Sequence, residues 1–583
     1  HPRWHGWMTD EGRWTELARE WALFRSPDLD SPISPIHLMV APLFQAVVAL
    51  TFEAAGVALE TARLPSRIAG VILLLAAAVG LRRALHSWAW VTMVALVALH
   101  PELTYLSRVA IPEMPALLAG FGAFLLVVRP HASPRTDLLA GVLTMVAVAF
   151  KATTGLYLPA LALALVVIGP TLDGRSAPAR LRSWGVGVSL AFVLALVVAA
   201  LTVGVGMPGR GGALAAIISF LQFKVPYDVG TTFLLGESLD DVNLLLAILC
   251  PLLVAVLLRA PPDSAARRVY RGAMAWAAVW LGALMALEYF PPRYVVHLHL
   301  ALILAITGAI ALLSDPRGRS LSEGWRSWSQ RRRVLAGAVV GLPLAVVVVP
   351  AVGPRLDRIR TLGPLILVVA FTVGLLAARR PVGWVFRPRL LVFPLAAAVI
   401  WRGVQGPAVE RYWVIDASTE LLPWALAIVG GLAAAWASWR TRRSEVPGMR
   451  LPAGAVAYVG ALVILWAGIR HVPSLVQTTY RLEGLSQALT ERYPATDTIG
   501  VAKLTSAFIA TPFRYREVAS TTGLPEVVLT TIWSPDLPTE RVLQAGFRPV
   551  AEFEMPVFLF RGTPRPADQP LFVDAMPVAL LER

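Results

Sequence analysis

The sequence predicts an all-α polytopic membrane protein with a small C-terminal α/β domain, and three observations lead to this fold class. Hydrophobic residues make up 56% of the 583 residues and charged residues only 15%, with a mean hydropathy of +0.64. Apolar runs recur along most of the chain, many of them close to the ~20 residues that a spanning helix needs. The arginines gather in short loops between these runs, so the net charge of +15 indicates membrane orientation rather than nucleic-acid binding.

About 14 apolar runs are interpreted as spanning helices, and a further span is expected before His1, since the chain does not begin with Met. The predicted spans are 66–81, 88–104, 114–128, 138–150, 153–169, 184–204, 242–258, 272–288, 294–313, 334–351, 361–378, 390–404, 421–438 and 453–469.

The loops between these spans alternate in arginine content. One set holds pairs and clusters such as Arg82–Arg83 and the run 331–333, and the positive-inside rule makes this set cytoplasmic. The other set is poorer in arginine and is expected on the periplasmic or extracellular side. It comprises 1–62, 105–113, 205–241, 289–293, 352–360, 402–420 and the chain after Arg470.

This alternation requires that residues 36–58 do not cross the membrane. The segment contains Pro42, Gln45 and Glu53, and it is interpreted as an interfacial or partly embedded helix pair. The lone cysteine, Cys250, lies in an apolar run, so no disulfide forms within the chain.

From about residue 471 to 583 the pattern changes to that of a small exterior α/β domain. An amphipathic helix is expected over 472–494, strands at "TIGVAK" and "EVVLTTIW", and a helix, turn and hairpin over 540–562.

Charged residues on the predicted exterior side are the candidates for chemistry. Asp10 and Glu11 head a tryptophan-rich amphipathic segment, although Thr9 as N-cap with both acids in the first turn would also explain them. Arg108 and Glu113 flank the turn "SRVAIPE", where snorkelling and the helix dipole offer a structural explanation.

Two further turns carry candidates. Lys151 follows an apolar run in a chain with only two other lysines, Lys224 and Lys503, so it is either a point-charge phosphate ligand or a helix-end anchor. In "PPRYVVHLH" (291–299), the two histidines are spaced i, i+2 and fall on different helix faces, which disfavours metal binding.

The order of these motifs resembles the GT-C glycosyltransferases, most closely the branch with protein O-mannosyltransferases and lipid A aminoarabinose transferases (families 39 and 83). The resemblance rests on "DEGRWTELARE" (10–20), "SPISPIHLMVAPLF" (31–44), "ARLPSRIAG" (62–70), "YLSRVAIPEMPAL" (105–117) and "AFKATTGLYLP" (149–159). The chain departs from the family pattern in reading Lys-Ala rather than Lys-Gly at 151–152, and Glu113 where many relatives have Asp.

The resemblance implies a GT-C-like catalytic domain over 1–470, in a bacterial inner membrane, with its active site on the periplasmic face. It implies an enzyme that moves a sugar from a polyprenyl phosphate or diphosphate to an acceptor hydroxyl on a protein, lipid or glycan. Asp10 would be the general base, Glu11 would orient it or bind the acceptor, and the sugar carbon would be inverted. No nucleic acid takes part, and a divalent metal is possible but not required.

The remaining roles follow the same implication. Arg108, Lys151 and Arg293 would hold the donor phosphate, and sugar or acceptor would contact Glu113, His37, Tyr294, Lys224 and Tyr227; Glu113 could instead position Arg108. The loop 205–241 would be a flexible lid or a purely structural interfacial helix. The rival functions are a lipid or glycan transporter or flippase, and a non-catalytic membrane scaffold with the same fold. The sequence does not specify the sugar or the acceptor.

Overall fold

A computed structural model describes most of the chain up to residue 339 and parts of the C-terminal region. The described ranges are 6–25, 40–85, 87–203, 240–259, 263–286, 292–315, 317–330, parts of 332–339, most of 487–493, 498–501, 514–517, 524–531, 539–555 and 576–583. The predicted spans between 340 and 469, and the loop 205–241, lie outside these residues.

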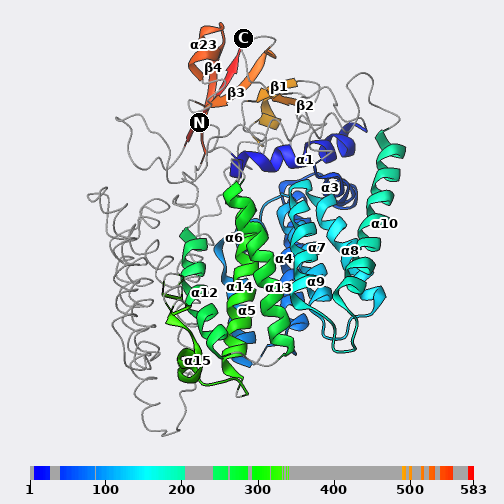
Figure 1. The fold of residues 1–583 in the computed structure, drawn as a ribbon. Helices are drawn as coiled ribbons and strands as arrows, with labels where there is room; N and C mark the ends of the chain where they lie inside the picture. Colours follow the sequence, from blue (N-terminus) through cyan, green and yellow to red (C-terminus); the bar gives the residue numbers. More distant parts are fainter. Residues whose placement is uncertain are drawn as a thin grey trace, which may run out of the picture.

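The first part is a bundle of helices that run side by side (Figure 1). Its elements are α1 (Gly6–Phe24), α3 (Pro42–Ala55), α4 (Leu59–Gly80), α5 (Ser87–Leu99), α6 (Pro101–Leu106), α7 (Glu113–Val127), α8 (Pro134–Phe150), the 3-10 turn η1 (Ala152–Leu156), α9 (Tyr157–Ile168), α10 (Ala177–Val203), α12 (Asp240–Arg259), α13 (Ala265–Ala286), α14 (Pro292–Ser314) and α15 (Leu321–Ser327).

Each apolar run predicted between 66 and 313 coincides with a helix, with one interruption. The run 88–104 is broken at His100, between α5 and α6. Pro101 accounts for the break, because a residue before proline is pushed out of the α region, and proline then suits the first turn of a new helix.

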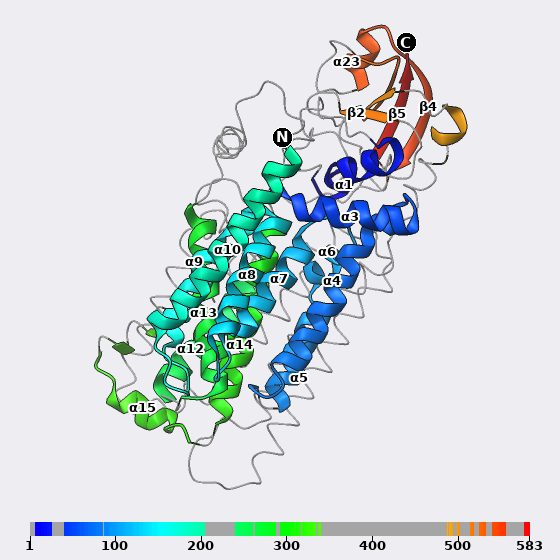
Figure 2. The ribbon, with the colours of Figure 1, turned by 90° about the vertical axis from the view of Figure 1, so that its right-hand side faces the viewer.

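The helices α1 and α3 lie across one end of the bundle rather than along it. Figure 1 shows α1 crossing this end, and Figure 2 shows α3 lying across it while α4 runs along the bundle. Thus α3 does not continue the direction of the spanning helices, which agrees with an interfacial position for this segment.

Two helices are long and apolar enough to cross a membrane by length and composition, Leu59–Gly80 and Tyr294–Ser314, and further apolar helices in the described part are shorter. On α4, large apolar side chains are exposed at helical spacing, at Leu64, Ile68, Val71, Ile72, Leu75 and Val79. By contrast, every residue of 294–313 on α14 is buried within the bundle. An exposed apolar stripe on one helix and a buried apolar helix inside the bundle fit a bundle surrounded by lipid.

Glycines let α8 and α10 approach at backbone distance. A Cβ on Gly141 would lie 2.1 Å from the carbonyl oxygen of Trp184, and one on Gly187 would lie 2.1 Å from that of Leu138. Side chains larger than hydrogen therefore do not fit at either position, as is common where membrane helices pack closely.

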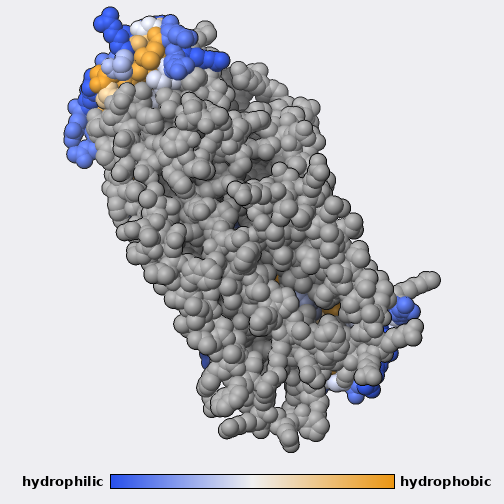
Figure 3. Space-filling model, turned by 90° about the vertical axis from the view of Figure 1, so that its left-hand side faces the viewer, coloured by the Kyte–Doolittle hydropathy of each residue, from blue (hydrophilic) through white to orange (hydrophobic). Residues whose placement is uncertain are grey.

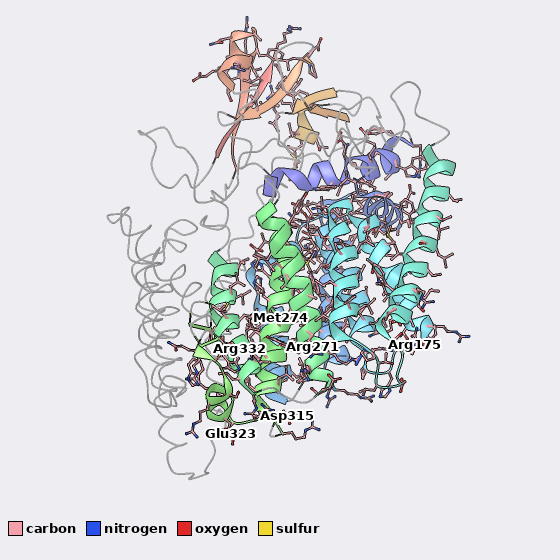
Figure 4. All side chains as sticks on the ribbon, viewed as in Figure 1. Arg175, Arg271, Met274, Asp315, Glu323 and Arg332 are labelled. Atoms are coloured by element: carbon pink, nitrogen blue, oxygen red, sulfur yellow. The ribbon has the colours of Figure 1, made fainter. Side chains whose placement is uncertain are left out.

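Arginines gather at the end of the bundle away from α1. Arg175, Arg271 and Arg332, labelled in Figure 4, lie in that half. Asp137, at the start of α8, accepts hydrogen bonds from Arg175 at 2.8 Å and from Arg180 at 3.0 Å. These arginines from the predicted cytoplasmic loops therefore lie at the end of the described bundle opposite α1.

The C-terminal region contains a five-stranded sheet in the order β2-β1-β3-β5-β4. Its strands are β1 (Thr498–Val501), β2 (Arg514–Glu517), β3 (Val527–Thr531), β4 (Arg548–Met555) and β5 (Met576–Glu582), with helix α23 (Thr539–Gln544) before β4. On the face drawn in Figure 3, hydrophilic described residues appear at both ends of the molecule.

The sheet combines two kinds of pairing. Strands β2, β1 and β3 are parallel, whereas β5 pairs antiparallel with both β3 and β4. The predicted strands at "TIGVAK" and "EVVLTTIW" contain β1 and β3, but the partner of β4 is β5, not a strand immediately after it. The second arm of the hairpin expected over 540–562 lies outside the described residues; in the described sheet β4 pairs with β5, near the end of the chain.

Candidate functional site

The acidic pair lies within α1, in the second turn of the helix. Because α1 begins at Gly6, Thr9 is not its N-cap, and the capping explanation for Asp10 and Glu11 is wrong. The side chain of Asp10 lies outside what the structure describes.

Glu11 is buried, with 2% of its surface exposed, and holds three donors. Arg63 of α4 binds it in a bidentate pair, from Nε to Oε1 and from Nη2 to Oε2, both at 2.9 Å. The backbone N–H of Ala110 also donates to Oε1 at 2.7 Å. Paired, hydrogen-bonded carboxylates of this kind fix geometry, so Glu11 joins α1 to α4 and to the turn after α6.

That turn carries Arg108. The turn is held at two residues. The carboxylate of Glu11 accepts from the N–H of Ala110, and the hydroxyl of Ser66 of α4 donates to the carbonyl of Ile111 at 3.0 Å. Arg108 itself is partly exposed and lies two residues before Ala110. The predicted cation therefore belongs to a loop that two helices hold in place.

Lys151 and Glu113 form a second ion pair, in which both partners are buried, with 1% and 0% of their side chains exposed. Lys151 is the C-cap of α8, and Glu113 is the first residue of α7 after Pro112. The turn after Lys151 is closed by Thr154, whose hydroxyl donates to the carbonyls of Ala147 and Lys151 at 2.8 and 2.7 Å. Lys151 therefore lies at a helix end, as expected for a helix-end anchor, and its ammonium pairs with the carboxylate of Glu113.

Two aromatic rings complete the surroundings of this ammonium. Lys151 Nζ lies 4.2 Å from the ring centre of Tyr294 and 5.3 Å from that of Trp14. Both distances are within the range of cation–π attraction. Trp14 lies one turn after Glu11 on α1, so this contact brings the acidic helix to the lysine turn.

Taken together, these contacts gather five of the residues singled out from the sequence, or their immediate neighbours, at one end of the bundle. The residues are Glu11, Arg108, Glu113, Lys151 and Tyr294, contributed by α1, the turn after α6, α7, the end of α8 and α14. Arg175, Arg271 and Arg332 lie toward the opposite end (Figure 4).

Other predicted residues are not described to the same extent. Arg293 lies in the first turn of α14, but its side chain is outside the described part, and His37, Lys224 and Tyr227 are outside it altogether. Their predicted roles stay predictions.

Three contact residues were not identified from the sequence: Trp14, Gln45 and Arg63. For Arg63 a signal was present, because an arginine in the first turns of an apolar helix needs an acidic partner. Arg67, four residues later, pairs with Glu60 of the same helix, so the sequence alone did not distinguish the two arginines.

The two histidines of α14 contact different neighbours. His297 Nδ1 lies 2.8 Å from the hydroxyl of Tyr157, and its ring stacks on Trp280 with centres 4.5 Å apart. His299 Nδ1 lies 2.9 Å from Glu102 of α6. Within the part of the chain that the structure describes, no three His, Cys, Asp or Glu side chains form a group that could hold a metal ion.

No protein-family model and no curated protein matches the chain. Two solved structures do, both of ArnT from Cupriavidus metallidurans. The structure of ArnT bound to undecaprenyl phosphate has a TM-score of 0.50 and 14% sequence identity, covering 98% of this chain and 93% of that one. The apo structure has a TM-score of 0.49, 13% identity and the same coverage.

This chain has a GT-C glycosyltransferase-like fold. ArnT is a lipid A aminoarabinose transferase of the GT-C superfamily, so the resemblance found in the N-terminal motifs is confirmed at the level of the fold. The match to this solved structure covers 98% of the chain, whereas the quoted motifs end at residue 159.

Proposed function

We propose that this GT-C-like chain is a membrane glycosyltransferase that moves a sugar from a polyprenyl phosphate or diphosphate to an acceptor hydroxyl on the exterior face. The observation that carries the proposal is the joining of α1 to both basic elements: Glu11 accepts from Ala110, beside Arg108, and Trp14 contacts Lys151. The solved ArnT with undecaprenyl phosphate bound supports the choice of carrier.

The chemistry requires a base and a cationic site. The acceptor oxygen attacks the anomeric carbon, the bond from that carbon to the carrier phosphate oxygen breaks, and the configuration inverts. A carboxylate takes the proton of the acceptor hydroxyl, and a cation stabilises the charge on the departing phosphate. This scheme uses a carboxylate and cations of the kinds that α1, the 107–112 turn and the lysine turn supply.

The contacts distribute these roles. Glu11 is already occupied by Arg63 and Ala110, so we assign it to orienting α1 and assign the base to Asp10. Arg108, in the held turn and partly exposed, is the first phosphate ligand. Lys151 is enclosed by Glu113, Trp14 and Tyr294, so a phosphate reaches its ammonium only if this enclosure opens.

The arginine distribution supports an exterior position for the proposed site. Arginine-rich loops favour the cytoplasm, which would put α1, α3 and the proposed site on the periplasmic or exterior face of a bacterial inner membrane. A lipid-linked sugar can meet its enzyme there, because its polyprenyl tail stays in the bilayer. Mass spectrometry of co-purified lipid would identify the carrier.

The decisive experiment is Asp10→Asn in a transfer assay with labelled polyprenyl-phosphate sugars. We expect kcat to fall about 10²–10⁴-fold, the usual contribution of a general base. Glu53→Gln is the matched control, since Glu53 is an exposed carboxylate on the neighbouring α3 that pairs with Arg25.

Full activity in Asp10→Asn would remove Asp10 as the base. A wild-type protein that transfers sugar from none of the carriers, while binding a partner stably, would favour the scaffold instead.

A further inference from the structure

Gln45 is a buried amide in an otherwise apolar stretch of α3, with 4% of its surface exposed. Its side chain crosses to α1. Gln45 Nε2 donates to the backbone carbonyl of Trp14 at 2.6 Å, and Oε1 accepts from the backbone N–H of Ala18 at 3.3 Å.

The two atoms that Gln45 binds form a matched pair. In an α-helix the carbonyl of residue 14 is the regular acceptor for the N–H of residue 18. The Gln45 amide bridges this one donor and one acceptor from the side. A flipped amide would set its NH₂ against the N–H of Ala18 and its oxygen against the carbonyl of Trp14, so these contacts define its orientation.

This bridge lies close to the proposed site. Trp14 is three residues, or about 4.5 Å along the axis, beyond Glu11, and its ring contacts Lys151. A shift of α1 along α3 would therefore move Asp10, Glu11 and Trp14 together. Misplacement of about 1 Å is enough to cost a reaction on the order of 10²-fold.

We propose that Gln45 is a positioning residue, whose amide sets the register of α1 on α3 and so places Asp10 for proton transfer. The inference rests on the proposed function for its catalytic consequence. The bridge itself does not depend on that function, and it can be tested without an activity assay.

The activity test uses Gln45→Met and Gln45→Glu. Methionine keeps the length and fills the space but provides neither hydrogen bond, so we expect kcat to fall about 10–10²-fold while KM for the carrier changes little. If Gln45 only fills space between the helices, Gln45→Met should keep a kcat near the wild-type value.

Gln45→Glu gives a pH signature. A neutral carboxylic acid can donate to Trp14 and accept from Ala18, whereas the ionised form cannot donate and faces a carbonyl oxygen. Activity relative to wild type, measured at each pH, is therefore expected to be high at low pH and to fall as pH rises. A flat ratio across the pH range would contradict the bridge.

Thr51→Val is the matched control on the same helix. The hydroxyl of Thr51 donates to the carbonyl of Val47 within α3 at 2.6 Å and does not reach α1. This variant is expected to keep wild-type kcat, KM and pH profile.

Hydrogen exchange provides the readout that is independent of transfer. Gln45→Met should raise exchange in the peptide covering α1, and Thr51→Val should not. If wild-type protein shows no transfer but Gln45→Met loosens α1, the proposed function fails and the bridge stands. If Gln45→Met changes neither exchange nor kcat, the positioning role is refuted. If Gln45→Met does not fold, the activity of Gln45→Glu relative to wild type across the pH range is the deciding measurement.

Discussion

At the residue scale, the site is held by two ion pairs with buried carboxylates: Glu11 pairs with the partly exposed Arg63, and Glu113 with the buried Lys151. Glu11 has three donors, two from Arg63 and one from Ala110, whereas the described partner of Glu113 is the ammonium of Lys151 between two rings. Burying charges costs free energy even when they are paired, so such pairs are poor sources of stability. We attribute both pairs to the geometry they impose on α1 and α8.

Removing one partner should expose this cost. Arg63→Met leaves Glu11 buried without its cation, and we expect the free energy of unfolding to fall by about 3 kcal/mol. Thermal or denaturant unfolding in detergent measures the change. Arg25→Met is the comparison, since Arg25 and Glu53 are both exposed and such pairs contribute at most about 1 kcal/mol.

An Arg63→Met loss no larger than that of Arg25→Met would show that the Glu11–Arg63 pair is energetically ordinary. The double variant Glu11→Gln/Arg63→Met should lose less than the two single losses added together, because it leaves no uncompensated charge.

Lys151→Met tests the second pair through carrier binding. If the ammonium holds the phosphate, affinity for polyprenyl phosphate should fall at least ~10-fold, the size expected for losing one charge-assisted contact. Binding of labelled carrier measures it. Arg82→Met, an exposed cation beside Trp90 at the arginine-rich end, is the control for net charge.

Equal affinity in Lys151→Met and wild type would leave Arg108 as the phosphate ligand. In that case Lys151 acts through its contacts with Glu113 and the two rings.

At the element scale, the glycines of α8 and α10 determine how closely these helices pack. Gly187 lies against the backbone of Leu138, whereas a Cβ on Gly185, two residues earlier in the same helix, would meet nothing within 4 Å. Gly187 and Gly185 therefore form a matched pair on α10, one packed against a backbone and one facing open space.

The corresponding substitutions should have opposite effects. Gly187→Ala forces the backbones apart and should destabilise the protein by about 1–3 kcal/mol. Gly185→Ala should be neutral or stabilising by about 0.5–1 kcal/mol, because alanine favours the helix. Unfolding of both variants in detergent is the measurement, and equal effects would contradict the close packing of α8 on α10.

At the scale of the whole molecule, the two ends of the bundle differ in charge and in helix direction. The crossing helices α1 and α3 mark one end, and arginines such as Arg175 and Arg271 lie toward the other (Figure 4). This polarity makes the orientation in the membrane a direct test of the proposed exterior site.

Single cysteines placed in a Cys250→Ala background can read this orientation, since Cys250 is the only cysteine. A membrane-impermeant maleimide added to intact spheroplasts should label Glu53→Cys but not Arg129→Cys; both native side chains are exposed, on opposite sides of the predicted membrane. The reverse pattern would place the site in the cytoplasm and remove the proposed periplasmic location.

The sequence by itself determined the helices between 66 and 313 and the division of the loops into arginine-rich and arginine-poor sets. Both follow from local composition: apolar length decides which segments can be helical in lipid, and arginine decides which loops stay in the cytoplasm. The break at His100 was also encoded locally, in Pro101, although the run 88–104 was predicted as one helix.

Only the tertiary structure decided which charges meet. Glu11 pairs with Arg63, 52 residues away, and with the amide of Ala110, 99 residues away, while Glu113 meets Lys151 across 38 residues. Residue types and spacing specify that these groups need partners, but the choice among several arginines depends on which helices lie side by side. The same reason explains Gln45, whose amide has a role only because α3 packs against the backbone of α1.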